Sequence, residues 1–349
     1  MQLQLAAVFF TLSLGTKTHY YGRTILYGGA KYRPTGRKVV VFHASFSENY
    51  RLYSRSHFTK GFELLLLLIV YDLFRRSYQS SMAYVLITYS IWFMSITWLF
   101  APFLFNPSGF DWEKIVDDWK DWNKWINVQG GIGVQPDKSW ESWWYEEQAH
   151  IRHSGLSSRL IEILLSLRFF LYQYGLVYHL DISQQSKNFL VYVLSWVVIF
   201  AIFLLIKAVN MGQQQFSTKY HFCFRLFKAF LFLGVLSIIV ILSIICKLSS
   251  MDIIVCGLAF LPTGWGLILL GQAVRPKIEN TGLWEFTLVM ARAYDHGMGV
   301  ILYAPIACLA WLPIISAFQT RFLFNKGLNR RLDLYSILAG KKNKKNRQA

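Results

Sequence analysis

The chain has 349 residues, of which 54% are apolar and only 16% are charged. Soluble globular domains carry about 25% charged residues, so this composition argues against an ordinary water-soluble domain. The 36 Lys and Arg residues outnumber the 19 Asp and Glu residues, and a net charge of +17 would indicate a nucleic-acid partner in a soluble protein. Here the basic residues flank apolar runs, so we expect membrane lipids as partners and no nucleic acid.

Apolar runs long enough to cross a bilayer recur along the chain, since a spanning helix needs about 20 residues. Five runs meet this length: Met82–Phe105, Phe189–Val209, Leu226–Cys246, Asp252–Ala273 and Gly297–Phe318. Shorter or more polar candidates are Met1–Gly15, Gly61–Phe74 and Arg159–Leu180. One such run could be a buried core helix, but five in one chain favour a membrane protein. The predicted fold class is all-α, a polytopic transmembrane helix bundle of about seven to eight hydrophobic segments with amphipathic interfacial helices.

Residues 1–60 are expected to combine a membrane segment with a basic strip. Met1–Gly15 could be a signal peptide, but no basic residue precedes its apolar run, so a truncated transmembrane or re-entrant segment is preferred. Lys17–Lys60 is rich in Arg, Lys and Tyr and holds one carboxylate, Glu48. Such a strip is typical of the cytosolic side and of the headgroup level of a membrane.

Residues 61–106 are predicted to form a transmembrane hairpin, and residues 107–158 a Trp-rich cytosolic segment. Trp112, Trp119, Trp122 and Trp125 follow spacings of seven, three and three, which place them on one helical face. Glycines at 130, 131 and 133 end this helix, and Ser139 is a plausible N-cap for a second one. We therefore expect two amphipathic helices joined by a glycine turn.

Residues 159–325 are expected to form a C-terminal transmembrane bundle, followed by a basic tail over 326–349. The run Arg159–Leu180 carries Glu162 and Arg168, which would be costly against lipid. Whether this run crosses decides the side of the tail, so the number of crossings and the side of the tail stay open.

The sequence holds no catalytic motif: no P-loop, no GxSxG, no HExxH and no dinucleotide-binding glycine pattern. One acidic group could in principle bind a divalent metal: Asp111, Glu113, Asp117, Asp118 and Asp121. On a helix these side chains spread over several faces, so a solvated polar face is preferred and no metal site is predicted.

Aromatic and helix-breaking residues in the apolar runs offer a second kind of site. Pro262, Gly264 and Gly266 surround Trp265 and would kink or break a span. Broken helices line cavities in membrane proteins, whereas small residues also allow tight helix packing, and both readings stay open. Because sugars stack on aromatic faces, several tryptophans could line a path for a polysaccharide: Trp92, Trp98, Trp196, Trp265 and Trp311.

Several long motifs resemble the end of the catalytic region and the following membrane region of plant callose synthases. They are GTKTHYYGRTILYGGAKYRPTGR (Gly15–Arg37), ENYRLYSRSHF (Glu48–Phe58), WLFAPFLFNPSGFDWEKIVDDWKDWNKWI (Trp98–Ile126), GGIGV (Gly130–Val134), KSWESWWYEEQAHIR (Lys138–Arg152), LSLRFFLYQYGLVYHL (Leu165–Leu180), LAFLPTGWG (Leu258–Gly266), ARAYDHGMG (Ala291–Gly299) and FQTRFLFN (Phe318–Asn325). The resemblance covers essentially the whole chain and departs slightly at KVVVFHASF (Lys38–Phe46).

The resemblance implies a 1,3-β-D-glucan synthase of glycosyltransferase family 48, a multi-pass protein of the plant plasma membrane that serves cell-wall biogenesis. Such an enzyme extends a glucan from UDP-glucose and exports it. The large catalytic region of the family is expected to precede Met1, so this chain alone should be inactive. It needs no cofactor of its own, while Mg²⁺ is a candidate for the full-length enzyme. The expected partners are membrane lipids, the missing catalytic region and the glucan product.

The resemblance carries no catalytic residue into this chain, and these remain unknown. The basic strip offers candidates for holding a diphosphate or lipid headgroups: Arg23, Arg33, Arg37, Arg51 and Arg55. Candidates for the glucan path are Arg168, Trp265 and Trp311. Two other functions stay open, namely a membrane channel or transporter module, and a non-catalytic membrane scaffold.

Overall fold

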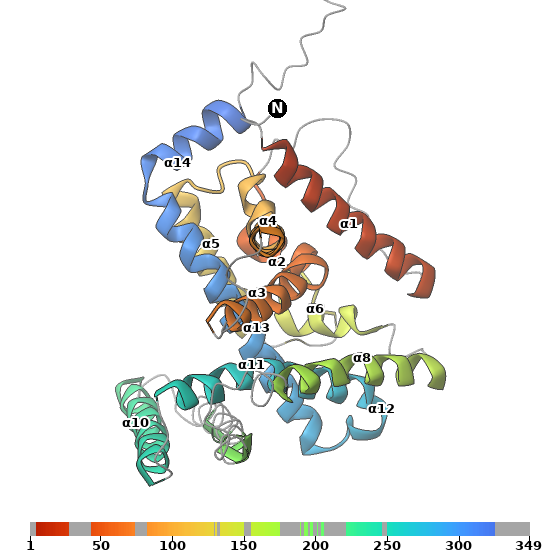
Figure 1. The fold of residues 1–349 in the computed structure, drawn as a ribbon, viewed down its shortest axis with the longest axis vertical. Coiled ribbons are helices and arrows are strands. Elements are labelled where there is room, and N and C mark those ends of the chain that lie inside the picture. Colours follow the sequence, from red (N-terminus) through yellow and green to blue (C-terminus); the bar gives the residue numbers. More distant parts are fainter. Residues whose placement is uncertain are drawn as a thin grey trace, which may run out of the picture. The chain divides into compact units, whose positions relative to one another are not determined.

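The structure is a computed structural model that describes residues 5–27, 43–73, 82–149, 155–174, 221–245 and 250–324, without 129, 131 and 132. Between 189 and 205 it describes isolated residues. Within these ranges the regular elements are helices and no strand occurs, so the predicted all-α class is confirmed (Figure 1). The chain divides into two compact units. The first comprises Met1–Leu68, Tyr78–Ser139 and Gly299–Ala349, and the second comprises Ile69–Ser77 and Trp140–Met298.

The helices of the first unit come from both ends of the chain. They are α1 (Ala6–Tyr27), α2 (Phe46–Tyr53), the π-helix η2 (Ser54–Phe58), most of α3 (Thr59–Leu73), α4 (Met82–Leu104), α5 (Trp112–Asn127), the end of α13 (Gly282–Ala310), α14 (Pro313–Phe318) and the π-helix η6 (Gln319–Leu323). Helix α1 continues past Gly15, from the first apolar segment into the basic strip. Ser45 caps α2, since its hydroxyl accepts from the amide of Glu48 at 3.3 Å.

An aromatic cluster forms the centre of the first unit. Phe46 of α2 stacks on Phe103 of α4 at 5.3 Å and meets Trp122 of α5 edge-on at 5.0 Å. Tyr50 lies 4.8 Å from Trp122, and Phe58 stacks on Phe103 at 5.6 Å. Large buried rings contribute most of the apolar area of a core, so this cluster fixes α2, α4 and α5 against one another.

The second unit contains α6 (Trp140–Glu147), α8 (Leu156–Tyr174), α10 (His221–Ile245), α11 (Ser250–Ala273), α12 (Arg275–Ile278) and the first part of α13. The two helices predicted for the Trp-rich segment are present as α5 and α6, and Trp122 and Trp125 of α5 are buried whereas Trp112 is 51% exposed. Ser139 does precede α6, and its hydroxyl donates to the carbonyl of Val128 at 2.8 Å.

The predicted apolar runs correspond to helices wherever they are described. Met82–Phe105 corresponds to α4, and Ser95 of α4 donates to the carbonyl of Gly61 in α3 at 2.9 Å. Leu226–Cys246 and Asp252–Ala273 fall in α10 and α11. Phe189–Val209 lies mostly outside the described residues, as does the end of Arg159–Leu180, which begins within α8.

Among the described residues, one helix is long and apolar enough to cross a bilayer, Val85–Leu104. A second candidate is a bent pair, Gly282–Ala310 with Pro313–Leu323, whose two parts meet at 86°. The prediction of one continuous run over Gly297–Phe318 was therefore wrong. Leu312 is extended, with ψ at 110°, because a residue that precedes proline disfavours the helical region.

Candidate functional site

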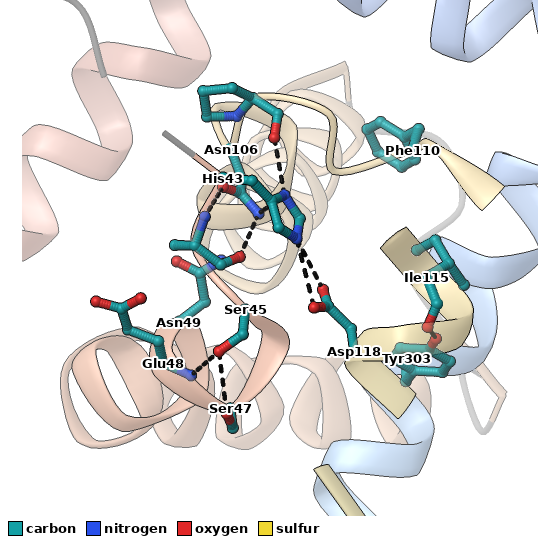
Figure 2. A network of polar contacts seen from close by, with 12 residues as sticks. His43, Ser45, Ser47, Glu48, Asn49, Asn106, Phe110, Ile115, Asp118 and Tyr303 are labelled. Atoms are coloured by element: carbon teal, nitrogen blue, oxygen red, sulfur yellow. Dashed lines mark hydrogen bonds and ion pairs between the residues drawn. The ribbon is translucent and has the colours of Figure 1, made fainter. Parts of the chain in front are cut away.

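A buried histidine–aspartate pair joins the start of α2 to α5 in the first unit. The Nε2 atom of His43 lies 3.2 Å from Oδ2 and 3.4 Å from Oδ1 of Asp118. The Nδ1 atom lies 2.9 Å from the carbonyl of Pro107. Figure 2 shows the ring between Asn106 and Asp118, with its two nitrogen atoms directed to different partners. The side chains are 19% and 12% exposed, so water screens this pair weakly.

The partners of His43 favour its charged form. Nε2 faces a carboxylate and Nδ1 faces a carbonyl. A carbonyl and an ionised carboxylate can only accept hydrogen bonds, so each ring nitrogen is suited to carry an N–H donor. The hydrogen bond to Asp118 raises the pKa of His43, and the Pro107 carbonyl adds to this, while burial and nearby Lys114 oppose it. The geometry therefore describes an imidazolium held by a carboxylate.

The turn between α4 and α5 is held by two side-chain amides. Asn106 pairs with the backbone of Ala44, accepting from its amide at 2.9 Å and donating to its carbonyl at 2.8 Å. Gln319 donates to the carbonyls of Leu104 at 3.0 Å and Asn106 at 2.7 Å, and it accepts from the amide of Phe110 at 3.3 Å. Three segments far apart in sequence thus meet at the end of α4.

The end of α13 packs on α5 within the same unit. Tyr303 donates its hydroxyl to the carbonyl of Ile115, and its ring lies 4.8 Å from that of Trp119. A side chain at Gly299 would overlap the ring of Trp122. Only glycine allows the backbone of α13 to come this close to α5.

A second buried histidine, His57 of η2, is held in the opposite charge state. Its Nε2 atom donates to the carbonyl of Leu12 in α1 at 3.1 Å, and its Nδ1 atom accepts from the hydroxyl of Ser56 at 2.7 Å. Burial lowers the pKa of His57 to about 4, helped by the charge of Lys60 and opposed by the Leu12 carbonyl. His57 is therefore neutral at physiological pH.

Neither histidine is arranged for proton transfer to a substrate. An imidazolium whose two N–H groups both donate has no lone pair for a general base, and His57 uses both nitrogen atoms within the fold. Among the described residues, no group of three or more His, Cys, Asp or Glu side chains could hold a metal ion. The contacts of His43 and His57 hold helices in position, and the His43–Asp118 pair adds an electrostatic attraction between the start of α2 and α5.

The second unit has its own polar cluster, between α6 and α13. Trp140 donates from Nε1 to Oδ2 of Asp295 at 2.9 Å, and Arg292 donates to Glu141 at 3.1 Å. Trp140 is fully buried and Asp295 is nearly so. A tryptophan N–H that donates to a buried carboxylate offsets part of the cost of removing that charge from water.

Arg275 of α12 completes this cluster. Its guanidinium lies 4.7 Å from the ring centre of Tyr145 and 4.8 Å from that of Trp284, and it donates to Glu279 at 2.9 Å. Trp284 also donates to the hydroxyl of Tyr145 at 3.3 Å. Arg275 is itself buried, so a guanidinium that stacks on two rings and pairs with a carboxylate anchors α12 within the second unit.

The predicted break around Trp265 does not occur. Helix α11 runs through Pro262 without interruption. A side chain at Gly264 would overlap Tyr294 of α13, and one at Gly266 would press on Phe169 and Phe170 of α8. The small residues therefore serve close helix packing, which was one of the two readings left open, and the broken-helix reading was wrong.

The candidate arginines of the basic strip are only partly described. Arg23 lies on α1, Arg51 on α2 and Arg55 on η2, where Arg51 and Arg55 are half-buried. Arg33 and Arg37 lie outside the described residues.

The three candidates for the glucan path differ in exposure. Arg168 donates to the carbonyl of Leu165 at 2.9 Å and lies 4.6 Å from the ring centre of Phe169. Trp265 is 8% exposed, with its ring 6.0 Å from that of Tyr294, whereas Trp311 is 78% exposed. Arg168 and Trp265 belong to the second unit and Trp311 to the first.

Asp118 was expected on a solvated polar face, which was wrong. Asp117 is exposed, as expected, but Asp118 is buried against His43. His43, Asn106 and Gln319 were not anticipated either, because they lie far apart in sequence and no spacing pattern links them. One sequence signal for a buried Asp118 was available, because helical periodicity places it on the buried face of α5 with Trp122 and Trp125.

Comparison with known proteins supplies the family. The model of the 1,3-beta-glucan synthase component family matches residues 1–257. The chain is 71% identical over 342 residues to "Putative callose synthase 8", 58% identical over 344 residues to "Putative callose synthase 6" and 56% identical over 344 residues to "Callose synthase 7", all of Arabidopsis thaliana. These matches cover 98–99% of the chain. The chain belongs to the 1,3-beta-glucan synthase component family, as the motifs had indicated.

The same matches cover 17–18% of the length of these relatives, so the chain spans about a sixth of each. No solved structure matches the chain.

Proposed function

We propose that this chain is the C-terminal membrane part of a callose synthase, which polymerises glucose from UDP-glucose and exports the glucan across the plasma membrane. The match of nearly the whole chain to callose synthases at 56–71% identity carries this proposal. The proposal includes a multi-pass bundle of about seven to eight segments. Helix α4 is the described helix that is long and apolar enough to span by itself, and the other segments rest on the apolar runs of the sequence.

The part played by this chain is to hold helices in register beside a catalytic region. Two pairs of buried polar groups link its helices, His43 with Asp118 and Trp140 with Asp295. Glucosyl transfer needs donors aimed at the diphosphate leaving group and, as a candidate, Mg²⁺. We assign those groups to the remainder of the longer protein.

The basic strip is the candidate for contact with anions. Arg51 of α2 and Arg55 of η2 are four residues apart in sequence. Their neighbours in these helices, Tyr50 and Phe58, pack on each other in the aromatic cluster. Together with Arg23, Arg33 and Arg37 they would attract a diphosphate or anionic headgroups through long-range electrostatics.

The proposed glucan path has uneven support from Arg168, Trp265 and Trp311. Trp311 offers an open ring for stacking on a sugar, since 78% of its surface is exposed. Trp265 packs against Tyr294, so a sugar could reach its ring only after a side chain moves. Trp311 is therefore the first of the three to test.

A chimera tests the proposal. The matching part of the 71% identical relative is replaced by this chain, expressed in membranes and supplied with labelled UDP-glucose. We expect a labelled, alkali-insoluble glucan that an endo-1,3-β-glucanase degrades, and none from the 349-residue chain alone. A matched chimera with Trp311→Ala reports on the path, and one with Lys120→Ala serves as the surface control.

Polymer made by the isolated chain would contradict the assignment of catalysis to the missing region. A chimera that reaches the membrane in the folded form but makes no glucan would contradict the proposed function. Ion flux through vesicles that contain the isolated chain would favour a channel or transporter module instead.

A further inference from the structure

We infer that the corner between α13 and α14 is a re-entrant wedge that enters one membrane leaflet from the side of α5 and returns to that side. This inference rests on the proposed membrane location of the chain and adds to it the topology of residues 299–323. The alternative is a broken span, whose two arms would end on opposite sides of the bilayer.

Both arms of the corner are tied to the same stretch of the first unit. On the first arm, Tyr303 donates to the carbonyl of Ile115, and Gly299 lies against Trp122. On the second arm, Gln319 bonds to Leu104, Asn106 and Phe110. These partners form the end of α4 and the first turns of α5, so the segment leaves this region and comes back to it.

Helix α5 marks one side of the membrane. It holds exposed Asp117 and Lys120 in mid-helix, which a lipid-exposed span would not tolerate. It also follows directly on α4, whose apolar stretch ends at Leu104. The contacts of Gln319 with the end of α4 thus place the second arm at the membrane surface on the α5 side.

The arms are too short to reach the far side. From Tyr303 to Ala310 the helix rises about 10 Å, and from Pro313 to Gln319 it rises about 9 Å. The hydrocarbon core of a bilayer is about 30 Å thick. The bend of 86° between the arms shortens the reach further (Figure 1).

The tip of the corner has the chemistry of a surface that contacts acyl chains. Val300–Thr320 contains no Asp, Glu, Lys or Arg. Its exposed apolar residues peak at the bend, where Trp311 is 78% and Ile314 is 79% exposed. A tryptophan at such a tip suits the boundary between headgroups and acyl chains, where its ring is apolar and its N–H meets water. The wedge therefore assigns the exposed ring of Trp311 to lipid, which competes with its candidate role on the glucan path.

Single cysteines in the full chain test this topology in sealed vesicles. The four native cysteines (Cys223, Cys246, Cys256 and Cys308) are replaced by serine or alanine, and one probe is then introduced at a time. Lys124→Cys marks α5, Arg321→Cys marks the second arm and Ile314→Cys marks the tip. Each variant is treated with a membrane-impermeant maleimide from one side, with and without detergent.

We expect Lys124→Cys and Arg321→Cys to react from the same side. Ile314→Cys should react at least tenfold more slowly than Lys124→Cys until detergent is added. Reaction of Lys124→Cys and Arg321→Cys from opposite sides would establish a broken span and overturn the inference. So would reaction of Ile314→Cys at the rate of Lys124→Cys. Release of the chain from membranes by an alkaline wash would instead overturn the proposed membrane location, so the two failures are distinguishable.

Discussion

His43 and His57 flank the same short helix, α2, and both are largely withdrawn from water, yet the fold favours opposite charge states in them. His43 faces a carboxylate and a carbonyl, so both its nitrogen atoms donate. His57 faces a carbonyl and a hydroxyl, so one nitrogen donates and the other accepts. A single carboxylate, that of Asp118, makes the difference.

This comparison shows what decides the charge of a buried histidine. Burial lowers the pKa of an imidazole in both places, because the charged form loses its hydration. At His43 the hydrogen bond to Asp118 outweighs burial and raises the pKa, whereas at His57 nothing opposes burial except one carbonyl. The stability contributions of His43 and His57 should therefore respond differently to mutation and to pH.

The largest effect is expected from Asp118→Ala measured at pH 5, where the His43 ring remains protonated and is left without its counter-charge. Removing one partner of a buried ion pair typically costs about 3–5 kcal/mol, and the partial exposure of this pair reduces the expectation to about 2–4 kcal/mol. Thermal unfolding of the purified chain in detergent measures this loss. Equal stability of Asp118→Ala and the unmodified chain would show that the pair contributes nothing.

A smaller loss is expected from His57→Leu. This change leaves the Leu12 carbonyl without its donor in a buried position, which costs about 1–3 kcal/mol for an unsatisfied group. It does not leave a charge, so the loss should be smaller than that of Asp118→Ala under the same unfolding conditions. A larger loss at His57 than at Asp118 would reverse the comparison.

The pH dependence of stability should distinguish the contribution of His43 from that of His57. His43 has a raised pKa, so its contribution is complete below pH 6.5 and is lost as the pH rises through the raised value. His57 has a pKa lowered to about 4, so its contribution is complete above pH 6.5 and is lost as the pH falls toward 4.

The unfolding midpoint recorded between pH 4 and pH 9 gives the measurement. Asp118→Asn should flatten the alkaline limb alone, and His57→Leu the acid limb alone. If either variant flattened the opposite limb, the assigned charge states would be wrong.

The smallest effect is expected from Lys120→Ala, which removes the pair with Asp117 on the exposed face of α5. Its side chains are 70% and 68% exposed and 3.3 Å apart. Exposed pairs contribute about 0–1 kcal/mol, so the unfolding midpoint should barely move. A loss as large as that of Asp118→Ala would mean that any charge change on α5 destabilises the unit.

The sequence predicted the local features of this molecule well. Hydropathy located α4, α10 and α11, and the spacing of Trp119, Trp122 and Trp125 located α5, because these patterns depend on neighbours in sequence. Pro313 was a sequence signal for the bend at Leu312, because a residue before proline disfavours the helical conformation. A count of apolar residues overlooks this signal.

The candidate site could not be predicted in the same way. His43 meets Asp118, and Gln319 meets Asn106, across separations of 75 and 213 residues. Such pairs arise from the packing of α2, α4, α5 and α14, and periodicity carries no information about them. Helical periodicity could have assigned Asp118 to the buried face of α5 and Asp117 to the exposed face, but no local pattern indicates that His43 is the partner of Asp118.

The central claim is that this chain positions helices while the chemistry belongs to the rest of a longer synthase. The most direct test is the rate of glucan synthesis per folded molecule in the chimera with Asp118→Asn, measured well below its unfolding midpoint. The account predicts a lowered unfolding midpoint with the rate per folded molecule unchanged. A rate that falls at least tenfold in molecules that remain folded would contradict it.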